Sequence, residues 1–216
     1  MVQCPSCARR CEPRLVCPGC GSPIAAELDC FAALGLPRRL TIDRDLLEQT
    51  YHEMGRRLHP DRFASSPDAE HDASLKATAL LTRSYRTLRD PVSRGLYWLE
   101  LNGEKLAEDN RRVPLEIAEL VFEVQEQIAE LRGAGGGAIE TGFIAAIGKR
   151  REELQGLMKQ ANHELAANFA RWDQNAGDQN GRAMLTIELK NVLSRIAYLR
   201  TLIRDVDRGL ESVTAA

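Results

Sequence analysis

Apolar residues recur at every third or fourth position along most of the chain, which is the pattern of amphipathic helices. The longest stripes lie within residues 115–131, 144–172 and 185–210. Their apolar positions are Ile117, Leu120, Val121, Val124, Ile128 and Leu131; Ile144, Ile147, Leu154, Met158, Ala161, Leu165, Phe169 and Trp172; and Leu185, Leu189, Val192, Ile196, Leu199, Ile203, Val206 and Leu210. The run GAGGG at 133–137 ends the first of these helices. We therefore predict a three-helix antiparallel bundle over 113–216.

Shorter helical segments fill residues 25–103. We expect helices over 25–34, from Thr41 or Asp43 to Leu58, over 68–89, and through Leu96 and Leu101 up to Asn102. The second and third carry matching apolar stripes, Leu47, Tyr51, Met54 and Leu58 on one and Ala77, Leu81, Tyr85 and Leu88 on the other. Two such helices pack as an antiparallel hairpin, and the polar run EKLAEDNRR at 104–112 links it to the bundle.

Composition narrows the functional class. A net charge of −2 does not favour a nucleic-acid-binding protein, and no run of eighteen apolar residues predicts a membrane span. The start, MVQCPSC, lacks the basic and apolar regions of a signal peptide. We expect a cytoplasmic protein that binds neither nucleic acid nor membrane.

All six cysteines lie in the first 30 residues. Cys4 and Cys7 form one CxxC pair, and nine residues later Cys17 and Cys20 form another. Two such turns facing each other give the four-sulfur shell that Zn²⁺ prefers, although iron in the same shell and a redox dithiol stay open. Because residues 1–24 have no periodic apolar pattern, we predict a small knuckle held by structural zinc. Cys11 is a spare thiol or exchanges with a neighbour, and Cys30 is a buried inert thiol on an apolar helix face.

The tripeptide His59-Pro60-Asp61 ends the second helix. Proline accounts for the stop, but it does not account for two exposed polar residues beside it. With Arg56, Arg57 and Arg62 they make a rigid, positive turn suited to an acidic partner. No nucleophile or second histidine stands at a catalytic spacing, and we expect His52, His71 and His163 at the surface. The sequence predicts a binding protein rather than an enzyme.

A helix ending in HPD and followed by an antiparallel helix resembles the J-domains that stimulate the ATPase of DnaK-type chaperones. LGLP, HPDRF and LRDP, at their intervals within 28–103, resemble more narrowly the HscB-type co-chaperones of iron-sulfur cluster assembly, and the likeness extends over 28–212. The CxxC pairs resemble the zinc knuckle that some members carry. The resemblance implies an all-α protein with a knuckle at 1–24, a J-domain at 25–103, a linker at 104–112 and a bundle at 113–216.

An outward face on the first bundle helix is the candidate second site. Phe122 lies off the apolar stripe of that helix, among Ala118, Glu119, Glu123, Glu126 and Glu130, and Tyr198 is turned away from the stripe of the last helix. Alternatively, both rings pack against an edge of the bundle or the J-domain. The resemblance places these residues at the positions that bind a scaffold protein, although the family usually has a Leu-Met pair in place of Ala118 and Glu119.

The resemblance implies a non-enzymatic adaptor with two partners. The HPD turn would bind a DnaK- or HscA-type chaperone, and the bundle would bind an IscU-type scaffold bearing a [2Fe-2S] cluster. Two alternative functions stay open: a J-protein for another client, and a zinc-ribbon nucleic-acid module using Arg9, Arg10 and Arg14. A weak homodimer stays open beside any of these functions.

Overall fold

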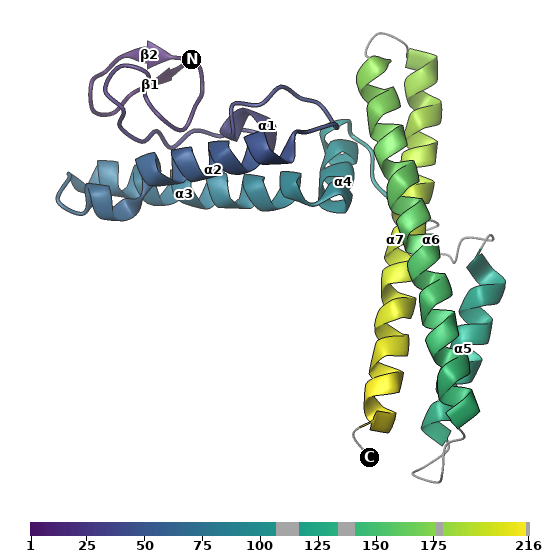
Figure 1. Ribbon diagram of the computed structural model, residues 1–216. Helices are drawn as coiled ribbons and strands as arrows, with labels where there is room; N and C mark the ends of the chain where they lie inside the picture. The colour runs from purple at the N-terminus through teal and green to yellow at the C-terminus, as the bar shows by residue number, and fades with distance from the viewer. Residues whose placement is uncertain (107–116, 134–140, 176–178, 215–216) are drawn as a thin grey trace. The chain divides into compact units, whose positions relative to one another are not determined.

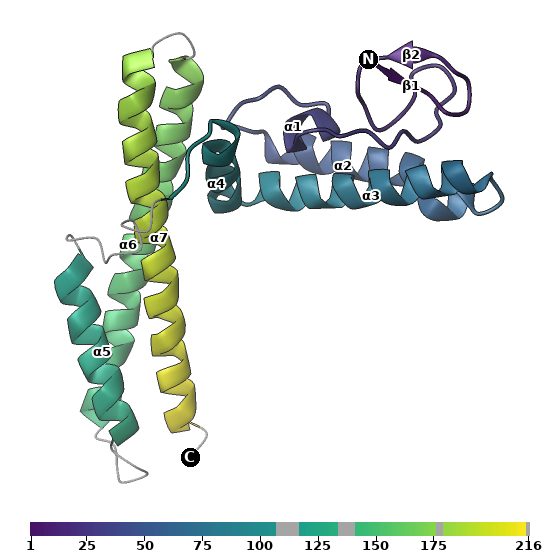
Figure 2. The ribbon, with the colours of Figure 1, turned by 180° about the vertical axis from the view of Figure 1, so that it is seen from behind.

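The structure is a computed structural model that describes residues 1–106, 117–133, 141–175 and 179–214. The chain divides into two compact units, Met1–Tyr97 and Trp98–Ala216. Over the described ranges it consists of seven α-helices, one 3₁₀ helix and two short strands (Figures 1 and 2). The predicted all-α fold is therefore confirmed. No helix in these ranges is both long and apolar enough to cross a membrane.

The first 24 residues form a small knuckle. Strand β1 (Val2–Gln3) pairs antiparallel with β2 (Arg10–Cys11), and Val16 bridges to Pro23. The buried residues beneath these pairs are Cys4, Cys11, Cys17 and Ile24. Two strands of two residues and so few buried side chains cannot hold a fold by themselves, as predicted from the missing apolar pattern.

Four helices follow in the chain: α1 (Cys30–Ala33), α2 (Arg44–Leu58), α3 (Asp68–Arg89) and α4 (Pro91–Leu101), with the 3₁₀ helix Pro60–Phe63 between α2 and α3. The predicted helix over 25–34 is wrong at its start. Asp29 caps α1, because its carboxylate accepts a hydrogen bond from Ala32 N at 2.8 Å. Ile24 N still donates to Leu15 O of the knuckle, so the chain before Asp29 is held outside the helix.

Helices α2 and α3 lie side by side as a hairpin (Figure 1). Of the two predicted stripes, Leu47, Leu58, Ala77, Leu81 and Leu88 are buried, and Tyr51, Met54 and Tyr85 are half-buried. Leu58, Leu81 and Leu88 have no exposed surface, and the rings of Tyr51 and Tyr85 stack at 4.1 Å between centroids. Asp43, rather than Thr41, caps α2, since it accepts hydrogen bonds from the amides of Asp45 and Leu46.

The second unit holds the long helices α5 (Ala118–Gly133), α6 (Thr141–Gln174) and α7 (Gln179–Thr214). Helices α6 and α7 form an antiparallel hairpin, and α5 lies alongside it (Figures 1 and 2). Leu154 and Leu165 of α6, Leu189 and Ile196 of α7, and Val124 of α5 are buried, which confirms the three-helix bundle. The side chains of Ile128 and Leu131 and residues 134–137 of the GAGGG run lie outside the described residues.

The predicted linker contains a residue that contacts the bundle. Glu104 accepts a hydrogen bond from Lys190 Nζ of α7 at 2.6 Å, so the first linker residue is fixed to the second unit. Residues 107–116, which include 107–112 of the linker and 113–116 of the predicted bundle, lie outside the described residues. The exact domain boundaries stay predictions.

Candidate functional site

The HPD turn is an exposed, preformed structure. His59 ends α2 with an extended backbone, and Pro60 opens the 3₁₀ helix, where its fixed φ and missing N–H are tolerated. Asp61 N donates to His59 Nδ1 at 3.3 Å, while 58% of the His59 side chain and 90% of the Asp61 side chain are exposed. The turn thus presents both polar groups to solvent.

Two hydroxyl groups of α3 hold the end of α2. Because Arg62 N, its partner in a continued helix, donates to His59 O instead, the Leu58 carbonyl needs other donors. It accepts hydrogen bonds from Ser74 Oγ at 2.6 Å and Thr78 Oγ1 at 3.0 Å. The sequence analysis missed both residues, although two hydroxyls spaced four apart on the apolar side of α3 are a readable signal.

Replacing both hydroxyls, as Ser74→Ala with Thr78→Val, is expected to lower the free energy of unfolding by about 1–3 kcal/mol, because the buried Leu58 carbonyl loses its donors. Urea unfolding followed by circular dichroism measures this loss. Thr82→Val, one turn further along α3, removes a hydroxyl without touching that carbonyl and is the control. Equal midpoints for the control and the double variant would show that the two hydroxyls do not hold the turn.

The predicted arginines surround the turn. Arg56, Arg57 and Arg62 are all exposed. Arg62 Nη1 donates to the Arg56 carbonyl at 3.4 Å, so it also braces the end of α2. Of the other histidines, His52 and His163 are exposed as predicted, whereas His71 is half-buried, which corrects its predicted surface position.

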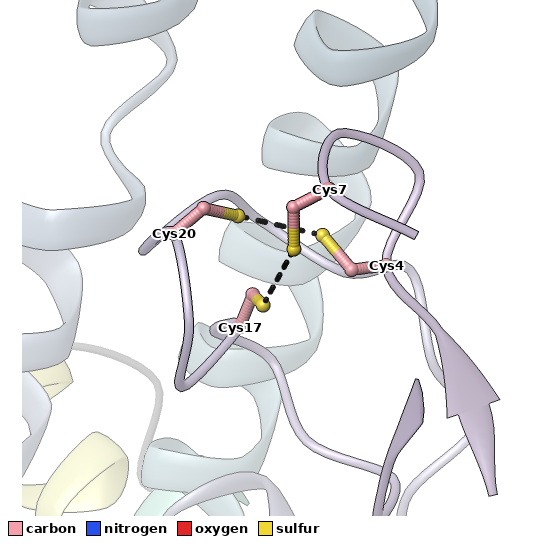
Figure 3. Close-up of side chains that lie close together, drawn as sticks. All are labelled: Cys4, Cys7, Cys17 and Cys20. Atoms are coloured by element: carbon pink, nitrogen blue, oxygen red, sulfur yellow. Dashed lines mark hydrogen bonds between the residues drawn. The ribbon is translucent and has the colours of Figure 1, made fainter. Parts of the chain in front are cut away.

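The four cysteines of the two CxxC pairs come together, as predicted (Figure 3). All four sulfur atoms lie within 4.8 Å of one another; Cys4 and Cys20 are 3.5 Å apart, and Cys7 and Cys17 are 3.7 Å apart. A tetrahedral Zn²⁺ with bonds of about 2.3 Å separates its sulfurs by roughly 3.8 Å. The donor set and its spacing therefore fit a metal ion of this kind. Cys11 is buried outside this group, and Cys30 is buried in the first unit.

The two CxxC turns repeat one backbone pattern. Cys4 N donates to Arg9 O while Ala8 N donates to Cys4 O; Cys17 N donates to Ser22 O while Gly21 N donates to Cys17 O. Ala8 and Gly21 both have left-handed backbones, with φ of 57° and 78°. Gly19 N also points at Cys17 Sγ, at 3.4 Å. The backbone thus turns both pairs towards one centre.

The pKa values of the cysteine thiols are consistent with a metal ion held by the four sulfurs. Hydrogen bonds from the Ser22 side chain and backbone lower the pKa of Cys20 to about 6, so this sulfur is a thiolate at neutral pH. The Arg9 backbone lowers the pKa of Cys7, but hydrogen bonding with Cys20 and burial outweigh it and raise that pKa to about 12. The backbones of Cys20 and Gly19 likewise lower the pKa of Cys17. The raised pKa of Cys7 shows that the crowded sulfurs resist a further negative charge, which a bound dication would relieve.

The candidate face of α5 exposes its aromatic residue. Phe122 is 72% exposed, as the pattern predicts, and Glu119, Glu126 and Glu130 are exposed on the same helix. The side chain of Ala118, the first residue of α5, lies outside the described residues. The face therefore has an apolar centre with carboxylates around it.

Two residues of this face differ from expectation. Glu123 pairs with Arg150 Nη2 of α6 at 2.8 Å and so joins α5 to the hairpin, while 55% of its side chain is exposed. Tyr198 is half-buried on α7 rather than fully turned outwards. Periodicity missed the Arg150 pair, since it joins side chains from helices that are separate in sequence.

Comparison with known proteins gives one consistent result. The chain is 31% identical over 191 residues to a co-chaperone protein HscB homolog of Azoarcus sp. strain BH72, covering 88% of this chain and 98% of that protein. Over 84 residues it is 38% identical to co-chaperone protein HscB of Proteus mirabilis, covering 39% of this chain and 49% of that protein. No family model matches the chain.

Solved structures share the fold. The crystal structure of human co-chaperone protein HscB superposes with a TM-score of 0.70 at 23% identity, covering 96% of this chain and 98% of that one. The chaperone HscB from Vibrio cholerae superposes with a TM-score of 0.58 at 20% identity, covering 86% and 99%.

Proposed function

The chain belongs to the HscB family of co-chaperones, and on that premise we propose that it delivers an IscU-type iron-sulfur scaffold to a DnaK- or HscA-type chaperone and stimulates the chaperone's ATPase. The adaptor carries out no reaction itself, because phosphate chemistry belongs to the chaperone. The cluster on the scaffold is cargo, and zinc in the knuckle is structural. We place the protein in the cytoplasm.

The observation that carries this proposal is the exposed HPD turn. His59 and Asp61 point into solvent on a backbone fixed by Pro60 and by the hydroxyls of α3. A partner that binds a preformed turn does not lose free energy by ordering it. Arg56, Arg57 and Arg62 add positive charge that steers an acidic partner.

The scaffold contact is proposed on α5 and α7. Phe122 is the largest exposed apolar side chain described on α5, and Glu119, Glu126 and Glu130 surround it with negative charge. Tyr198 and Ala118 complete the proposed face, while Glu123 contributes through its pair with Arg150. An aromatic anchor with a polar rim is typical of protein interfaces.

Phe122→Ala is expected to weaken scaffold binding by about tenfold or more, because anchor residues of this kind contribute one to several kcal/mol. Titration calorimetry with an IscU-type scaffold measures the change. Met184→Ala is the matched control, since Met184 of α7 is 67% exposed and lies outside the proposed face.

Equal affinity for Phe122→Ala and the unchanged protein would reject this face. No binding by the unchanged protein, together with intact stimulation of the ATPase, would instead favour the second candidate function, a J-protein for another client. The observation that favours this alternative is Glu119, which is exposed and charged at a position where the family usually has an apolar residue.

A further inference from the structure

The knuckle is seated on the helical hairpin of its own unit. Ser6, between the first two cysteines, donates to Glu70 Oε1 of α3 at 2.9 Å. Hydrogen bonds from Ser22 and Ser6 lower the pKa of Glu70, so both CxxC turns contact this carboxylate. Leu15, between the two cysteine pairs, is only 1% exposed. The position of the knuckle on the J-domain is therefore fixed by contacts from both pairs.

A groove of about 500 Å³ runs along this junction. Pro13, Arg14 and Pro18 line it from the knuckle, and Ala32, Met54 and Arg57 line it from the helices. Among the described residues that line the groove, Arg14 and Arg57 are the charged ones, and no carboxylate faces it. Its walls are a mixture of polar and apolar surface, and its charge is positive.

The two guanidinium groups are weakly engaged by their own neighbours. Arg14 Nη2 lies 3.8 Å from Glu12 Oε2, and 82% of the Glu12 side chain is exposed. Arg57 Nη1 lies 4.0 Å from Glu53 Oε1, and 67% of that side chain is exposed. Long, solvated ion pairs contribute little, so an incoming carboxylate competes with them easily.

We propose that this groove binds an acidic segment of the chaperone, so that the knuckle and the J-domain form one docking surface. The inference rests on the proposed function and extends it to a residue outside the J-domain. Arg57 lies in the last turn of α2, and His59 caps the same end of that helix, so the groove and the HPD turn adjoin one helix end. Two guanidinium groups match carboxylates, while Met54 and Pro18 accept an apolar side chain beside them.

Arg14→Glu tests the groove in a chaperone ATPase assay, with the full-length protein as the titrant. The concentration giving half-maximal stimulation is expected to rise about fivefold, while the maximal rate stays, because the HPD turn is untouched. The difference should shrink at high salt. Arg10→Glu makes the same charge change at an exposed residue that does not line the groove and is the control.

Metal content and circular dichroism verify that both variants keep the knuckle. If Arg14→Glu disturbs the knuckle, Arg14→Gln replaces it, and we expect a smaller rise in the concentration that gives half-maximal stimulation. Equal half-maximal concentrations for the Arg14 variants and Arg10→Glu, with His59→Gln inactive, would overturn the groove and leave the proposed function standing. If His59→Gln stimulates as well as the unchanged protein, the proposed function and the inference fail together.

Discussion

His59→Gln is expected to lower stimulation of the chaperone's ATPase by about tenfold or more, while the fold survives. The described contacts of His59 are local: its Nδ1 accepts from Asp61 N and lies 3.5 Å from Asp61 Oδ2. The turn itself is held by the ring of Pro60 and by the bonds of Ser74 and Thr78 to Leu58 O. A loss of stimulation would therefore report a lost contact with the chaperone rather than a misfolded turn.

The measurement is single-turnover ATP hydrolysis by a DnaK- or HscA-type chaperone, titrated with the unchanged protein and the variant. His52→Gln is the matched control, because His52 is also exposed on α2 and its Nε2 is 3.7 Å from the nearest described carboxylate oxygen, Glu48 Oε1. We expect the control to stimulate fully. Equal stimulation by His59→Gln and the unchanged protein, or none by either, would refute the J-domain role.

The periodic helices and the CxxC cluster of this protein can be predicted from its sequence, but the side-chain contacts between separate segments cannot. Apolar periodicity predicts the long helices because burial along one face requires it. CxxC spacing predicts the sulfur cluster because four donors must meet one ion. In contrast, two interactions depend on how separate segments pack: the hydrogen bond from Ser6 to Glu70 and the ion pair between Arg150 and Glu123.

A local hydrogen bond also sets one helix boundary that the apolar pattern does not predict, the start of α1. The apolar pattern predicts a helix from residue 25, but a single carboxylate, Asp29, starts α1 at Cys30 because it caps the free amide of Ala32. The Asp29 cap and the hydrogen bond from Ile24 N to Leu15 O of the knuckle outweigh the weak helical propensity of residues 25–29. The HPD turn gives a second example. The sequence predicts that Pro60 ends α2, but it does not predict that Ser74 and Thr78 of α3 donate hydrogen bonds to the Leu58 carbonyl at that end.

Removing the metal is expected to unfold the knuckle and leave the α2–α3 hairpin folded. Binding of a structural Zn²⁺ supplies about 10–16 kcal/mol at neutral pH, and a knuckle with two short strands and few buried side chains has no comparable source of stability. The hairpin has its own core, in which Leu58, Leu81 and Leu88 are fully buried. Chelation should therefore release residues 1–24 without melting α2 and α3.

Hydrogen exchange before and after chelation measures the change, with metal content determined by mass spectrometry. Cys17→Ser should lose the metal and the protection of residues 1–24 together, because Cys17 Sγ is one of the four grouped sulfurs. Cys11→Ser is the control: Cys11 is buried beneath the site but outside the group, so that variant should keep the metal with some loss of packing. Unchanged protection after complete metal removal would show that contacts such as Ser6 with Glu70 hold the knuckle instead. Equal metal loss in both variants would show that Cys11 takes part in binding.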